Sequence, residues 1–373
     1  MKLFEYEGKK ILSEYSIPIP HGKLVSQGDK LGDFHFPVVI KAQVLIGGRG
    51  KKGLIRLAEN ERQIQDQLSC LMGIKIENIP IHQVLIEEKL EIKQELYLSI
   101  FVDRTTKGPV ITVGSVGGVD IEIVDRNKIF TKRIDPYIGL SNFLLREIVK
   151  KVQLMDKQLE KELARIITKL YQIYRDYEAE LVEINPLVIT TENQLIAADA
   201  KIILDNNALY RYPNLAKLNQ GRDLTIFEQE VAQSGANGVE FKKGNIGVVT
   251  SGAGLLMTTM DTIEHWGGEV KVGVDIASIG FDKNTERMIQ LLTNLKKIPL
   301  KAVLLSFYLQ IGRCDIFAQS INNAFQDLAE ETSIIVRLKG NRADLAKKIL
   351  SAKKFFVTDN FVDAVKQVIE KSK

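Results

Sequence analysis

Residues 181–201 read LVEINPLVITTENQLIAADAK, and most of this stretch has the composition of a buried sheet. Three polar residues interrupt the apolar runs, namely Glu183, Asn185 and Asp199. An unpaired polar group in an apolar environment costs roughly 2–7 kcal/mol, so these side chains need partners. The segment TTENQ (190–194) is rich in turn-forming residues and predicts a hairpin. We therefore expect two antiparallel strands with oxygen ligands set into them.

The length of the turn decides which side chains this hairpin brings together. A three-residue turn at 191–193 or a five-residue turn at 190–194 places Asn185 opposite Asp199, whereas turns of two or four residues do not. Glu183 shares a face with Asn185, because side chains alternate along a strand. One amide oxygen with one or two carboxylates suits Mg²⁺, whose remaining ligands are often substrate phosphates. The alternative, an edge ribbon with solvated polar side chains, stays open on the pattern alone.

The composition is that of a globular chain with more than one domain. A chain of 373 residues is too long for one ordinary core. Hydrophobic residues make up 45% and charged residues 26%, which is ordinary for a soluble protein. The 51 basic and 47 acidic residues give a net charge of +4 and are interspersed. Since a concentrated basic stripe is missing, we expect no nucleic-acid partner.

Three sequence features bear on the compartment. No run approaches the roughly 18 apolar residues that a membrane span requires. The start, MKLFEYEGKK, carries acidic residues and lacks the apolar centre of a signal peptide. Cys70 and Cys314 lie far apart without a CxxC companion, which excludes a disulfide framework or a zinc site and fits a reducing compartment. We therefore expect a cytoplasmic protein with no membrane association.

The rhythm of expected elements changes near residue 235. Before it, short strands are interrupted by a few helices, and the stretch after residue 201 looks irregular. Beyond it, strand and helix alternate, as is typical of a parallel sheet wrapped by helices. The polar, glycine-rich segment SGANGVEFKKGN (234–245) is the best linker candidate. We thus expect a multidomain α+β and α/β fold, with an α+β domain over residues 1–235 and an α/β domain over residues 236–373. The expected elements of the first domain include helices over 4–15, 59–72, 140–153, 157–176 and 223–233 and a strand over 119–124.

A second candidate site precedes the hairpin in the chain. The stretch VVIKAQVLIGGRGKKG puts Lys41 on a strand, followed by a loop in which Gly47, Gly48 and Gly50 surround Arg49. Glycines let a backbone approach phosphates closely, and cations balance the phosphate charge. The loop matches neither GxxxxGK[ST] nor GxGxxG, and most glycine-rich loops are simply turns. Together with a divalent-metal hairpin, however, it favours the binding of a nucleoside triphosphate.

Several longer motifs resemble one family from end to end. They are LFEYEGKKILSEYSIPIP (3–20), KAQVLIGGRGKKG (41–53), ELYLSIFVDR (95–104), LVEINPLVIT (181–190) with the later AADAK, and GNIGVVTSGAGLLMTTMD (244–261). These stretches are similar to the β subunits of succinate–CoA ligases (succinyl-CoA synthetases). The resemblance implies an ATP-grasp domain followed by a flavodoxin-like CoA-ligase domain with a parallel sheet.

The resemblance also implies roles for individual residues. Asn185 and Asp199, which the hairpin already suggests as metal ligands, are expected to bind Mg²⁺. Glu183 is expected to steady a histidine as it visits the nucleotide, which makes it the catalytic candidate. Pro20 matches the adenine-nucleotide form of the family. The remaining positions expected to bind ATP or ADP are Lys41, Gly48, Arg49 and Gly50 at the phosphates, Glu87 beside the adenine, Glu95 at the ribose, and Leu90.

The activity implied by the family needs a second chain. These enzymes are acid–thiol ligases that interconvert succinate, CoA and a nucleoside triphosphate with succinyl-CoA, nucleoside diphosphate and phosphate. The phosphoryl group passes through a phosphohistidine on an α subunit, which also holds the CoA site. None of the four histidines here lies in a glycine-rich loop suited to phosphorylation. We therefore expect a partner α subunit, in a heterodimer or heterotetramer, and a small carboxylic acid as substrate.

The C-terminal domain departs from the family pattern at three loops. Ser251 stands where relatives carry Asn, the segment from Asp275 (275–282) lacks the family's glycine run, and SFYLQIGRCD (306–315) replaces NIFGGIVRCD. Leu309 and Gln310 stand at the positions of the two glycines in the family pattern. Backbone N–H groups at a helix start bind anions well, and side chains at the approach crowd them. The corresponding substrate candidates are Ser251, Gln310, Ile311 and Gly312, and Val116 replaces an acidic residue before a glycine pair.

Two other functions follow from these departures. The chain could be a paralogue that acts on another carboxylic acid, such as malate, because loops 275–282 and 306–312 are altered. It could also be a regulatory subunit that binds a nucleotide but does not complete acyl transfer. Succinate remains the default acid in the leading hypothesis.

Overall fold

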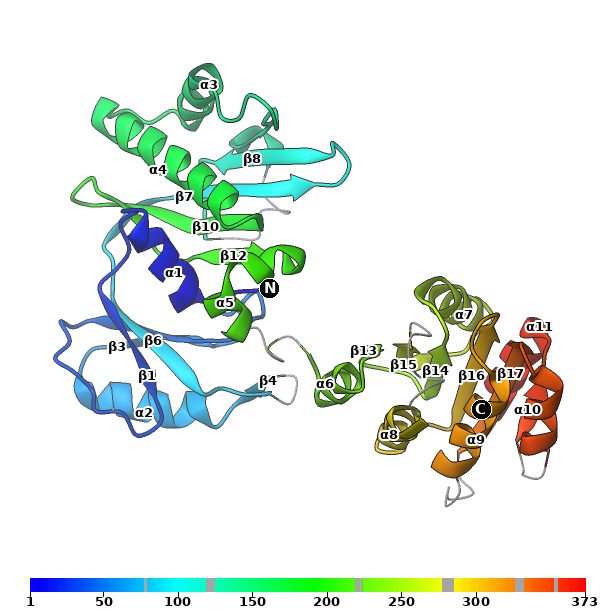
Figure 1. The fold of residues 1–373 in the computed structure, drawn as a ribbon. Coiled ribbons are helices and arrows are strands. Elements are labelled where there is room, and N and C mark those ends of the chain that lie inside the picture. The colour runs from blue at the N-terminus through cyan, green and yellow to red at the C-terminus, as the bar shows by residue number, and fades with distance from the viewer. Residues whose placement is uncertain are drawn as a thin grey trace. The chain divides into compact units, whose positions relative to one another are not determined.

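The computed structural model describes the chain except for residues 77–78, 119–124, 219–221, 223, 277–284, 326–331 and 352–354. The described residues form two compact units, Met1–Asp223 and Leu224–Lys373 (Figure 1). Each unit has its own hydrophobic core, and each is described by itself.

The first unit contains two main sheets and the helices that cover them. Its helices are α1 (Glu5–Glu14), α2 (Glu61–Met72), α3 (Asn142–Val152), α4 (Lys157–Asp176) and α5 (Pro213–Leu218), with 3₁₀ turns η2 (Arg126–Lys128) and η3 (Asn206–Arg211). Its strands are β1 (Gly22–Ser26), β2 (Val38–Ala42), β3 (Ile55–Ala58), β4 (Lys75–Ile76), β5 (Ile79–Pro80), β6 (Gln83–Glu88), β7 (Ile92–Asp103), β8 (Gly108–Gly114), β9 (Ile129–Arg133), β10 (Ala179–Thr190), β11 (Leu195–Ala197) and β12 (Lys201–Leu204).

The smaller sheet has the order β1-β6-β2-β3 and is antiparallel throughout. Its inner strand β2 buries Val38 and Ile40 in a core shared with Ile64 of α2. Side chains alternate along a strand, so Lys41 points to the opposite face. Helix α2 therefore fixes one face of the sheet and leaves Lys41 on the other.

The larger sheet has the order β11-β10-β7-β8-β9, with β12 also pairing with β10. Helix α4 covers one face with an apolar stripe that the spacing of Leu163, Ile167 and Leu170 predicts (Figure 1). Ile100 and Ile184 of the sheet lie in the same core. Glu183 and Asn185 alternate with Ile184 along β10 and therefore face away from α4.

The hairpin has the register that the turn predicted. Leu187 pairs with Ala197, and Glu183 pairs with Lys201 on the far side of the 198–200 interval. The strand register is the same for these two pairs, so Asn185, which lies midway between Glu183 and Leu187, is opposite Asp199. The backbone of residues 198–200 is in no strand, which opens the ladder where the two polar side chains meet.

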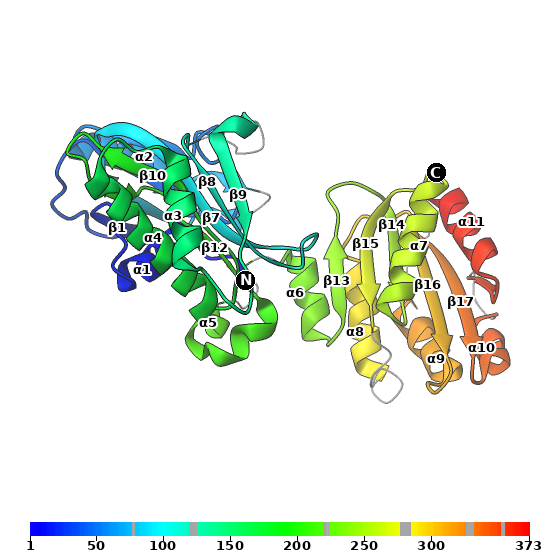
Figure 2. The same cartoon turned by 90° about the horizontal axis from the view of Figure 1, so that it is seen from above.

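The second unit is a doubly wound sheet with the order β13-β15-β14-β16-β17-β18. All its pairs are parallel except β13 with β15. Helices α7 and α11 cover one face, and α6, α8, α9 and α10 contribute to the core on the other (Figure 2). Its elements are α6 (Ile226–Gln233), β13 (Asn237–Glu240), β14 (Ile246–Thr250), α7 (Ala253–His265), β15 (Val270–Asp275), α8 (Thr285–Leu295), β16 (Ala302–Leu309), α9 (Cys314–Ala324), β17 (Ser333–Gly340), α10 (Ala343–Leu350), β18 (Phe356–Thr358) and α11 (Phe361–Ser372).

The segment interpreted as a linker belongs to the second unit. Residues 234–245 include β13, which pairs with β15, and the preceding helix α6 buries Phe227 and Val231 in the same core. The boundary between the compact units accordingly falls at 223/224, whereas the sequence placed it at 235/236. Polar composition suggested a linker because β13 is only partly buried.

Other expected elements differ in detail. The stretch after residue 201 is not irregular, because it forms β12, η3 and α5. Strands β1, β9 and β18 were missed, being short or rich in exposed polar residues. The strand expected over 119–124 lies outside the described residues.

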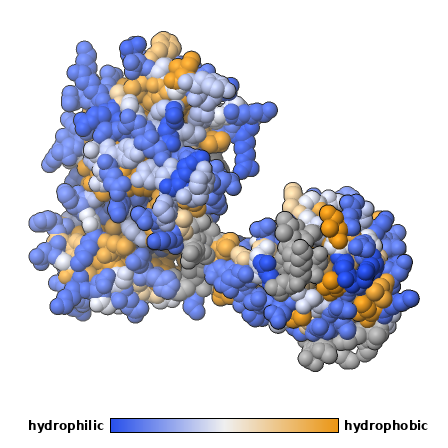
Figure 3. Space-filling model, in the orientation of Figure 1, coloured by the Kyte–Doolittle hydropathy of each residue, from blue (hydrophilic) through white to orange (hydrophobic). Residues whose placement is uncertain are grey.

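The surface is largely hydrophilic, with apolar groups scattered over it (Figure 3). Tyr137, Ile138 and Phe143, before and at the start of α3, are the most conspicuous exposed apolar side chains of the first unit together with Met155. Within the part of the chain that the structure describes, no helix combines the length and apolarity needed to cross a bilayer.

Candidate functional site

Six charged side chains from five regions of the first unit meet where α1 lies against both sheets. Helix α1 supplies Glu5 and Lys9, and Lys41 comes from the free face of β2. Arg49 comes from the glycine-rich loop. The remaining two are acids, Glu87 of β6 and Asp199 of the hairpin. We call these six residues, Glu5, Lys9, Lys41, Arg49, Glu87 and Asp199, the charge cluster.

Glu5 is the hub of the charge cluster. Its Oε1 accepts from Lys9 at 2.8 Å and from Lys41 at 2.9 Å, and its Oε2 accepts from Arg49 Nη1 at 2.6 Å. Its side chain is only 2% exposed. A carboxylate buried this deeply is stable only when it is fully paired, and three cations provide that pairing.

Glu87 closes the other side of the charge cluster. It accepts from Lys9 at 2.6 Å and from Lys41 at 2.8 Å, and its side chain is 3% exposed. Lys41 also donates to the carbonyl of Ala198, at 2.6 Å, next to the open part of the hairpin. The Lys41 ammonium is thereby fixed between both sheets.

Arg49 joins the glycine-rich loop to the hairpin. Its Nη2 donates to both carboxylate oxygens of Asp199, at 2.9 and 2.8 Å, while Nη1 holds Glu5. Around it the loop leaves open space: a Cβ added at Gly47, Gly48 or Gly50 would meet nothing within 4 Å. A phosphate could approach this backbone without a clash.

The charges of the cluster shift one another's pKa values. Burial alone would raise the pKa of Glu5, but Lys41, Lys9 and Arg49 outweigh it and hold the pKa well below its usual range. Burial alone would lower the pKa of Lys41, yet Glu5, Glu87 and Asp199 raise it above normal. For Lys9, burial and the neighbouring Lys41 win, and the pKa is lowered. Glu5 and Lys41 are therefore permanently charged at neutral pH.

Asn185 and Glu183 lie on the strand opposite Asp199. Asn185 Oδ1 accepts from the backbone N–H of Gly118 at 2.8 Å, and its Nδ2 donates to Glu183 Oε1 at 3.5 Å. Lys201 is 3.8 Å from Glu183. Burial raises the pKa of Glu183, in spite of Lys201 and Asn185.

The donor chemistry of the hairpin fits Mg²⁺. Asp199 offers a carboxylate whose side chain is 30% exposed, and Asn185 offers an amide oxygen on the facing strand. Among the described residues, no group of three or more His, Cys, Asp or Glu side chains could hold a metal by itself. A cation here would thus take two protein oxygens and complete its shell with phosphate and water, as Mg²⁺ usually does. Such a cation would compete with Arg49 for the Asp199 carboxylate.

The three residues expected near the base and ribose occupy different surroundings. Glu87 is buried in the charge cluster, where it neutralises Lys9 and Lys41. Leu90 lies half-buried in the connection between β6 and β7. Glu95, on β7, abuts Gly118 so closely that a Cβ there would lie 2.3 Å from its carboxylate, and burial raises its pKa. Glu95 and Asn185 are therefore linked through one glycine.

In the second unit, the expected substrate residues meet at the carboxyl edge of the sheet. Ser251 follows β14, and its Oγ accepts from the N–H of Tyr308 at 3.0 Å. Gln310 donates to Tyr308 Oη at 3.2 Å and is exposed, and Ile311 is 93% exposed. Gly312 is half-buried in the turn before α9. Of the altered loop 275–282, residues 277–282 lie outside the described part.

This edge matches the place where open α/β sheets bind ligands. Strands β15 and β16 flank β14 on opposite sides, which makes the carboxyl end of β14 a topological switch point. Helix α7 starts there after Gly252, whose φ of +138° favours glycine. The position is therefore suited to a ligand, although Leu309 is buried and continues β16 into its pairing with Gly340.

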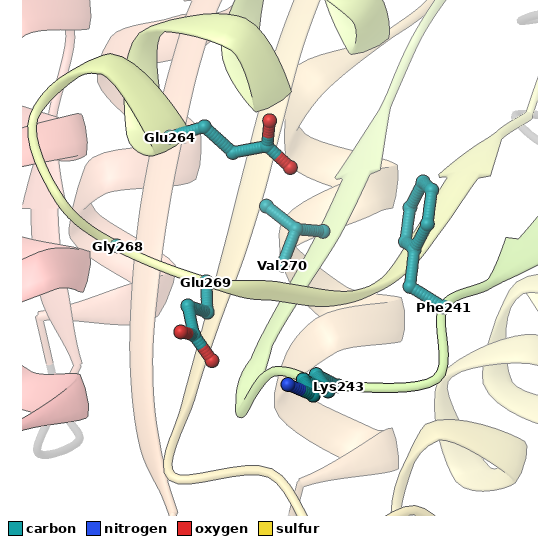
Figure 4. Close-up of a pocket in the computed structure, with 6 residues that line it drawn as sticks. All are labelled: Phe241, Lys243, Glu264, Gly268, Glu269 and Val270. Atoms are coloured by element: carbon teal, nitrogen blue, oxygen red, sulfur yellow. The ribbon is translucent and has the colours of Figure 1, made fainter.

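A shallow hollow of about 230 Å³ lies at the other end of the same sheet (Figure 4). It is lined by Phe241, Lys243, Glu264, Gly268, Glu269 and Val270. These residues precede β14 and β15 or end α7, so the hollow is at the amino edge. It is separate from Ser251 and carries no convergent set of catalytic groups.

Sequence reasoning missed two kinds of site residue. The sequence placed Glu5 and Lys9 on a helix but gave them no role in the site. Gly118 entered only as part of the glycine pair that follows Val116. Glu5 and Lys9 are one turn apart on a short helix, a spacing that usually indicates an exposed ion pair. Only tertiary contacts show that this pair is buried.

Two family models match the chain with the geometry described above. A model for an ATP-grasp domain matches residues 2–189, and a model for a CoA-ligase domain matches residues 249–368. The first match ends within β10 of the 181–201 hairpin, and the second begins near the carboxyl end of β14. The expected ATP-grasp and CoA-ligase domains are confirmed.

Relatives with assigned names align over almost the whole chain. A succinate–CoA ligase [ADP-forming] subunit beta from Aquifex aeolicus is 36% identical, covering 99% of this chain and 98% of the relative. A succinate–CoA ligase [GDP-forming] subunit beta from Thermus thermophilus is 35% identical, covering 99% and 98%. The fold resembles ATP citrate lyase from Methanothrix soehngenii, solved with citrate and coenzyme A, with a TM-score of 0.72 over 98% of this chain and 99% of that one at 19% identity.

Proposed function

Because this chain belongs to the succinate–CoA ligase β-subunit family of acid–thiol ligases, we propose that its first unit binds Mg²⁺ and ATP or ADP and exchanges a phosphoryl group with a histidine of a partner α subunit. One observation carries the proposal: Lys41 and Arg49 converge on the hairpin that places Asn185 opposite Asp199. Cations for phosphate and oxygen ligands for a metal thus meet at one point.

The phosphates would lie over the glycine-rich loop. Gly48 and Gly50 keep its backbone open, and Arg49 can turn its guanidinium from Asp199 to a phosphate oxygen. Lys41 stays fixed by Glu5 and Glu87, so it offers a preorganised charge. Phosphoryl transfer depends mainly on such positioning and charge stabilisation.

Asn185 and Asp199 would hold Mg²⁺. When bound, the ion would supply positive charge that neutralises the charge developing on the phosphates. Gly118 fixes the amide of Asn185 through its N–H. The chain's own contribution is therefore to orient two oxygen ligands toward the loop.

Glu183 is suited to receive the partner's histidine. It lies beside Asn185 on the strand, and its carboxylate can accept from an imidazole N–H. An acid in this position orients the ring nitrogen that attacks the phosphorus atom. Burial raises the pKa of Glu183. As the pH falls, this carboxylate is therefore protonated, and loses its role as an acceptor, at a higher pH than an ordinary glutamate.

The nucleotide and the compartment complete the proposal. Relatives of nearly equal identity are named ADP-forming and GDP-forming, so the identities alone favour neither. Pro20 supports an adenine nucleotide; Glu87 on β6, Leu90 in the connection and Glu95 on β7 are the proposed residues for base and ribose. A cytoplasmic location agrees with two free, unpaired cysteines.

Succinate is the first candidate acid, and a different carboxylic acid such as malate is the second. The observation that favours the second is the set of side chains at the carboxyl edge of the second unit. Leu309 and Gln310 stand where the family pattern has glycines, and the exposed Gln310 adds a hydrogen-bonding amide. An acid with an extra hydroxyl group could use such a partner.

Reconstitution with an α subunit tests both parts. The chain is co-expressed with its α subunit, and two signals are followed: labelling of the α-subunit histidine by γ-labelled ATP, and acid-dependent formation of ADP with CoA. We expect Mg²⁺-dependent labelling, and turnover with one acid from a panel of succinate, malate and other dicarboxylates.

The outcomes separate the candidates. Turnover with succinate alone supports the first acid, and turnover with malate alone supports the second. Labelling without turnover for any acid would support a regulatory subunit. An absence of labelling together with an absence of nucleotide binding would refute the proposed function.

A further inference from the structure

Glu5 contacts the two cations assigned to phosphate but is itself too deeply buried to touch a substrate. Its carboxylate spans Lys41 on one oxygen and Arg49 on the other. The side chain is 2% exposed, and it comes from α1, far from the loop and the hairpin in sequence. Its contribution has to act through the residues that it holds.

The charge cluster is balanced, and only one of its acids can be reached from outside. Three cations face three carboxylates, of which Glu5 is 2% and Glu87 is 3% exposed. Asp199 is 30% exposed and is held by Arg49 alone among the side chains of the charge cluster. A metal that binds Asp199 therefore competes with Arg49 for the carboxylate oxygens.

The guanidinium of Arg49 is divided between two acids. Nη1 donates to Glu5 and to the carbonyl of Ala42, whereas Nη2 donates to both oxygens of Asp199. Loss of Asp199 to a metal leaves Nη1 in place and frees Nη2. The freed N–H groups can then donate to a phosphate bound at the glycine-rich loop, of which Arg49 is a part.

We infer that Glu5 is a positioning residue that retains Arg49 while Arg49 exchanges Asp199 for a nucleotide phosphate. The inference rests on the proposed nucleotide site. With Glu5 in place, Arg49 divides its N–H groups between Glu5 and Asp199. Mg²⁺ then competes only with the hydrogen bonds from Nη2 to Asp199. Without the carboxylate of Glu5, Arg49 has Asp199 as its remaining acidic partner in the charge cluster, and the metal competes with the whole side chain.

Removal of the charge therefore has a specific signature. Glu5→Gln leaves three cations with two carboxylates, so a metal-free nucleotide binds as well as before or more tightly. Mg²⁺, in contrast, meets a tighter Arg49–Asp199 pair. The variant should consequently need more Mg²⁺ while it keeps its affinity for the free nucleotide.

The same helix offers a matched control. Glu7 is also a buried acid in the first turn of α1, but it pairs with Arg222 at 2.6 and 2.8 Å and caps the N–H of Phe4. It does not contact Lys41 or Arg49 in any described interaction. Glu7→Gln removes the same charge from the same helix and should leave the Mg²⁺ requirement unchanged.

The test is calorimetric titration of the full chain with ADP at a series of Mg²⁺ concentrations. We expect Glu5→Gln to raise the half-saturating Mg²⁺ concentration by about tenfold, since each factor of ten in affinity needs only about 1.4 kcal/mol of differential binding. ADP affinity without Mg²⁺ should stay within about threefold of wild type or improve. Melting temperatures are measured in parallel.

An Arg49→Lys variant extends the test if Glu5→Gln does not fold. A single ammonium cannot hold both acids, so Asp199 is released and the half-saturating Mg²⁺ concentration should fall. An unchanged Mg²⁺ requirement in Glu5→Gln, or a parallel loss of free-ADP and Mg²⁺-dependent binding, would overturn the inference. A rise in the Mg²⁺ requirement of Arg49→Lys would do the same. Wild-type protein that binds ADP without any Mg²⁺ dependence would instead refute the proposed site.

Discussion

The charge cluster of the first unit and the carboxyl edge of the second unit are built in opposite ways. In the charge cluster, Glu5, Lys41 and Glu87 are almost inaccessible and each has two or more charged partners. At the carboxyl edge, Tyr308, Gln310 and Ile311 are exposed and held by few hydrogen bonds.

This contrast indicates how easily each region can change. Removing one partner from a buried ion pair leaves an uncompensated charge and is strongly destabilising. Replacing an exposed side chain usually changes stability by less than about 0.5 kcal/mol. The charge cluster is therefore constrained by the fold that buries it, whereas the carboxyl edge of the second unit can vary at little cost.

The largest expected effect is on Lys41. Lys41→Met removes a fixed cation from the phosphate site and should lower the rate of histidine labelling by about 10²–10³-fold, the usual loss for a preorganised electrostatic group. Single-turnover labelling with γ-labelled ATP measures it. Lys52→Met, in the exposed part of the same loop, is the control and should label normally. A Lys41→Met rate close to wild type would show that the cations of the charge cluster do not act on phosphate.

Lys9 tests the structural side of the charge cluster. Lys9→Met removes one of the two cations that pair with both Glu5 and Glu87. It should destabilise the first unit by roughly 3–5 kcal/mol. Trp266, the single tryptophan, reports on the second unit, and circular dichroism reports on both. We expect an early circular-dichroism transition with the tryptophan transition unmoved. A shift of the tryptophan signal alone would contradict this assignment.

Glu183 predicts a pH dependence. Because burial raises its pKa, the carboxylate becomes protonated as the pH falls, at a higher pH than an ordinary glutamate with a pKa of 4.5. The protonated form accepts less well from the imidazole N–H of the attacking histidine, so histidine labelling should decline on the acid side through this raised pKa. In Glu183→Gln, labelling should be slower and this acid limb should be absent. An identical acid limb in both proteins would assign it to another group.

The smallest effect is expected at the carboxyl edge. Gln310→Gly restores one small residue and removes the amide that contacts Tyr308, without exposing any core. We expect the KM for the acid to change by up to about tenfold, as for one hydrogen bond, while histidine labelling changes by less than about twofold. Steady-state kinetics with the preferred acid and with succinate measure both. A loss of labelling would mean that the two regions are not separable in this way.

The sequence predicted the parts of this fold that depend on local chemistry. A turn of three or five residues at TTENQ predicted that Asn185 lies opposite Asp199, and the observed pairs on either side have that register. The apolar spacing of Leu163, Ile167 and Leu170 predicted α4. Alternation of strand and helix after β14 predicted the parallel sheet, which the register confirms.

The sequence did not predict features that depend on distant contacts. Glu5 meets Arg49 from 44 positions away, and Arg49 meets Asp199 from 150 positions away. No local pattern marks a glutamate of an N-terminal helix as buried. Strand β13 was mistaken for a linker because its polar residues are stabilised by pairing with β15, not by their own burial.

A crystal structure of the full chain with ADP and Mn²⁺ tests the central claim most directly, because the anomalous signal of Mn²⁺ locates the metal. We predict Mn²⁺ within coordination distance of Asn185 Oδ1 and the carboxylate of Asp199, bridged to a phosphate of ADP. Arg49 would then be turned from Asp199 to the phosphate and still bound to Glu5. Mn²⁺ bound elsewhere, or an intact Arg49–Asp199 pair beside a bound nucleotide, would contradict the account.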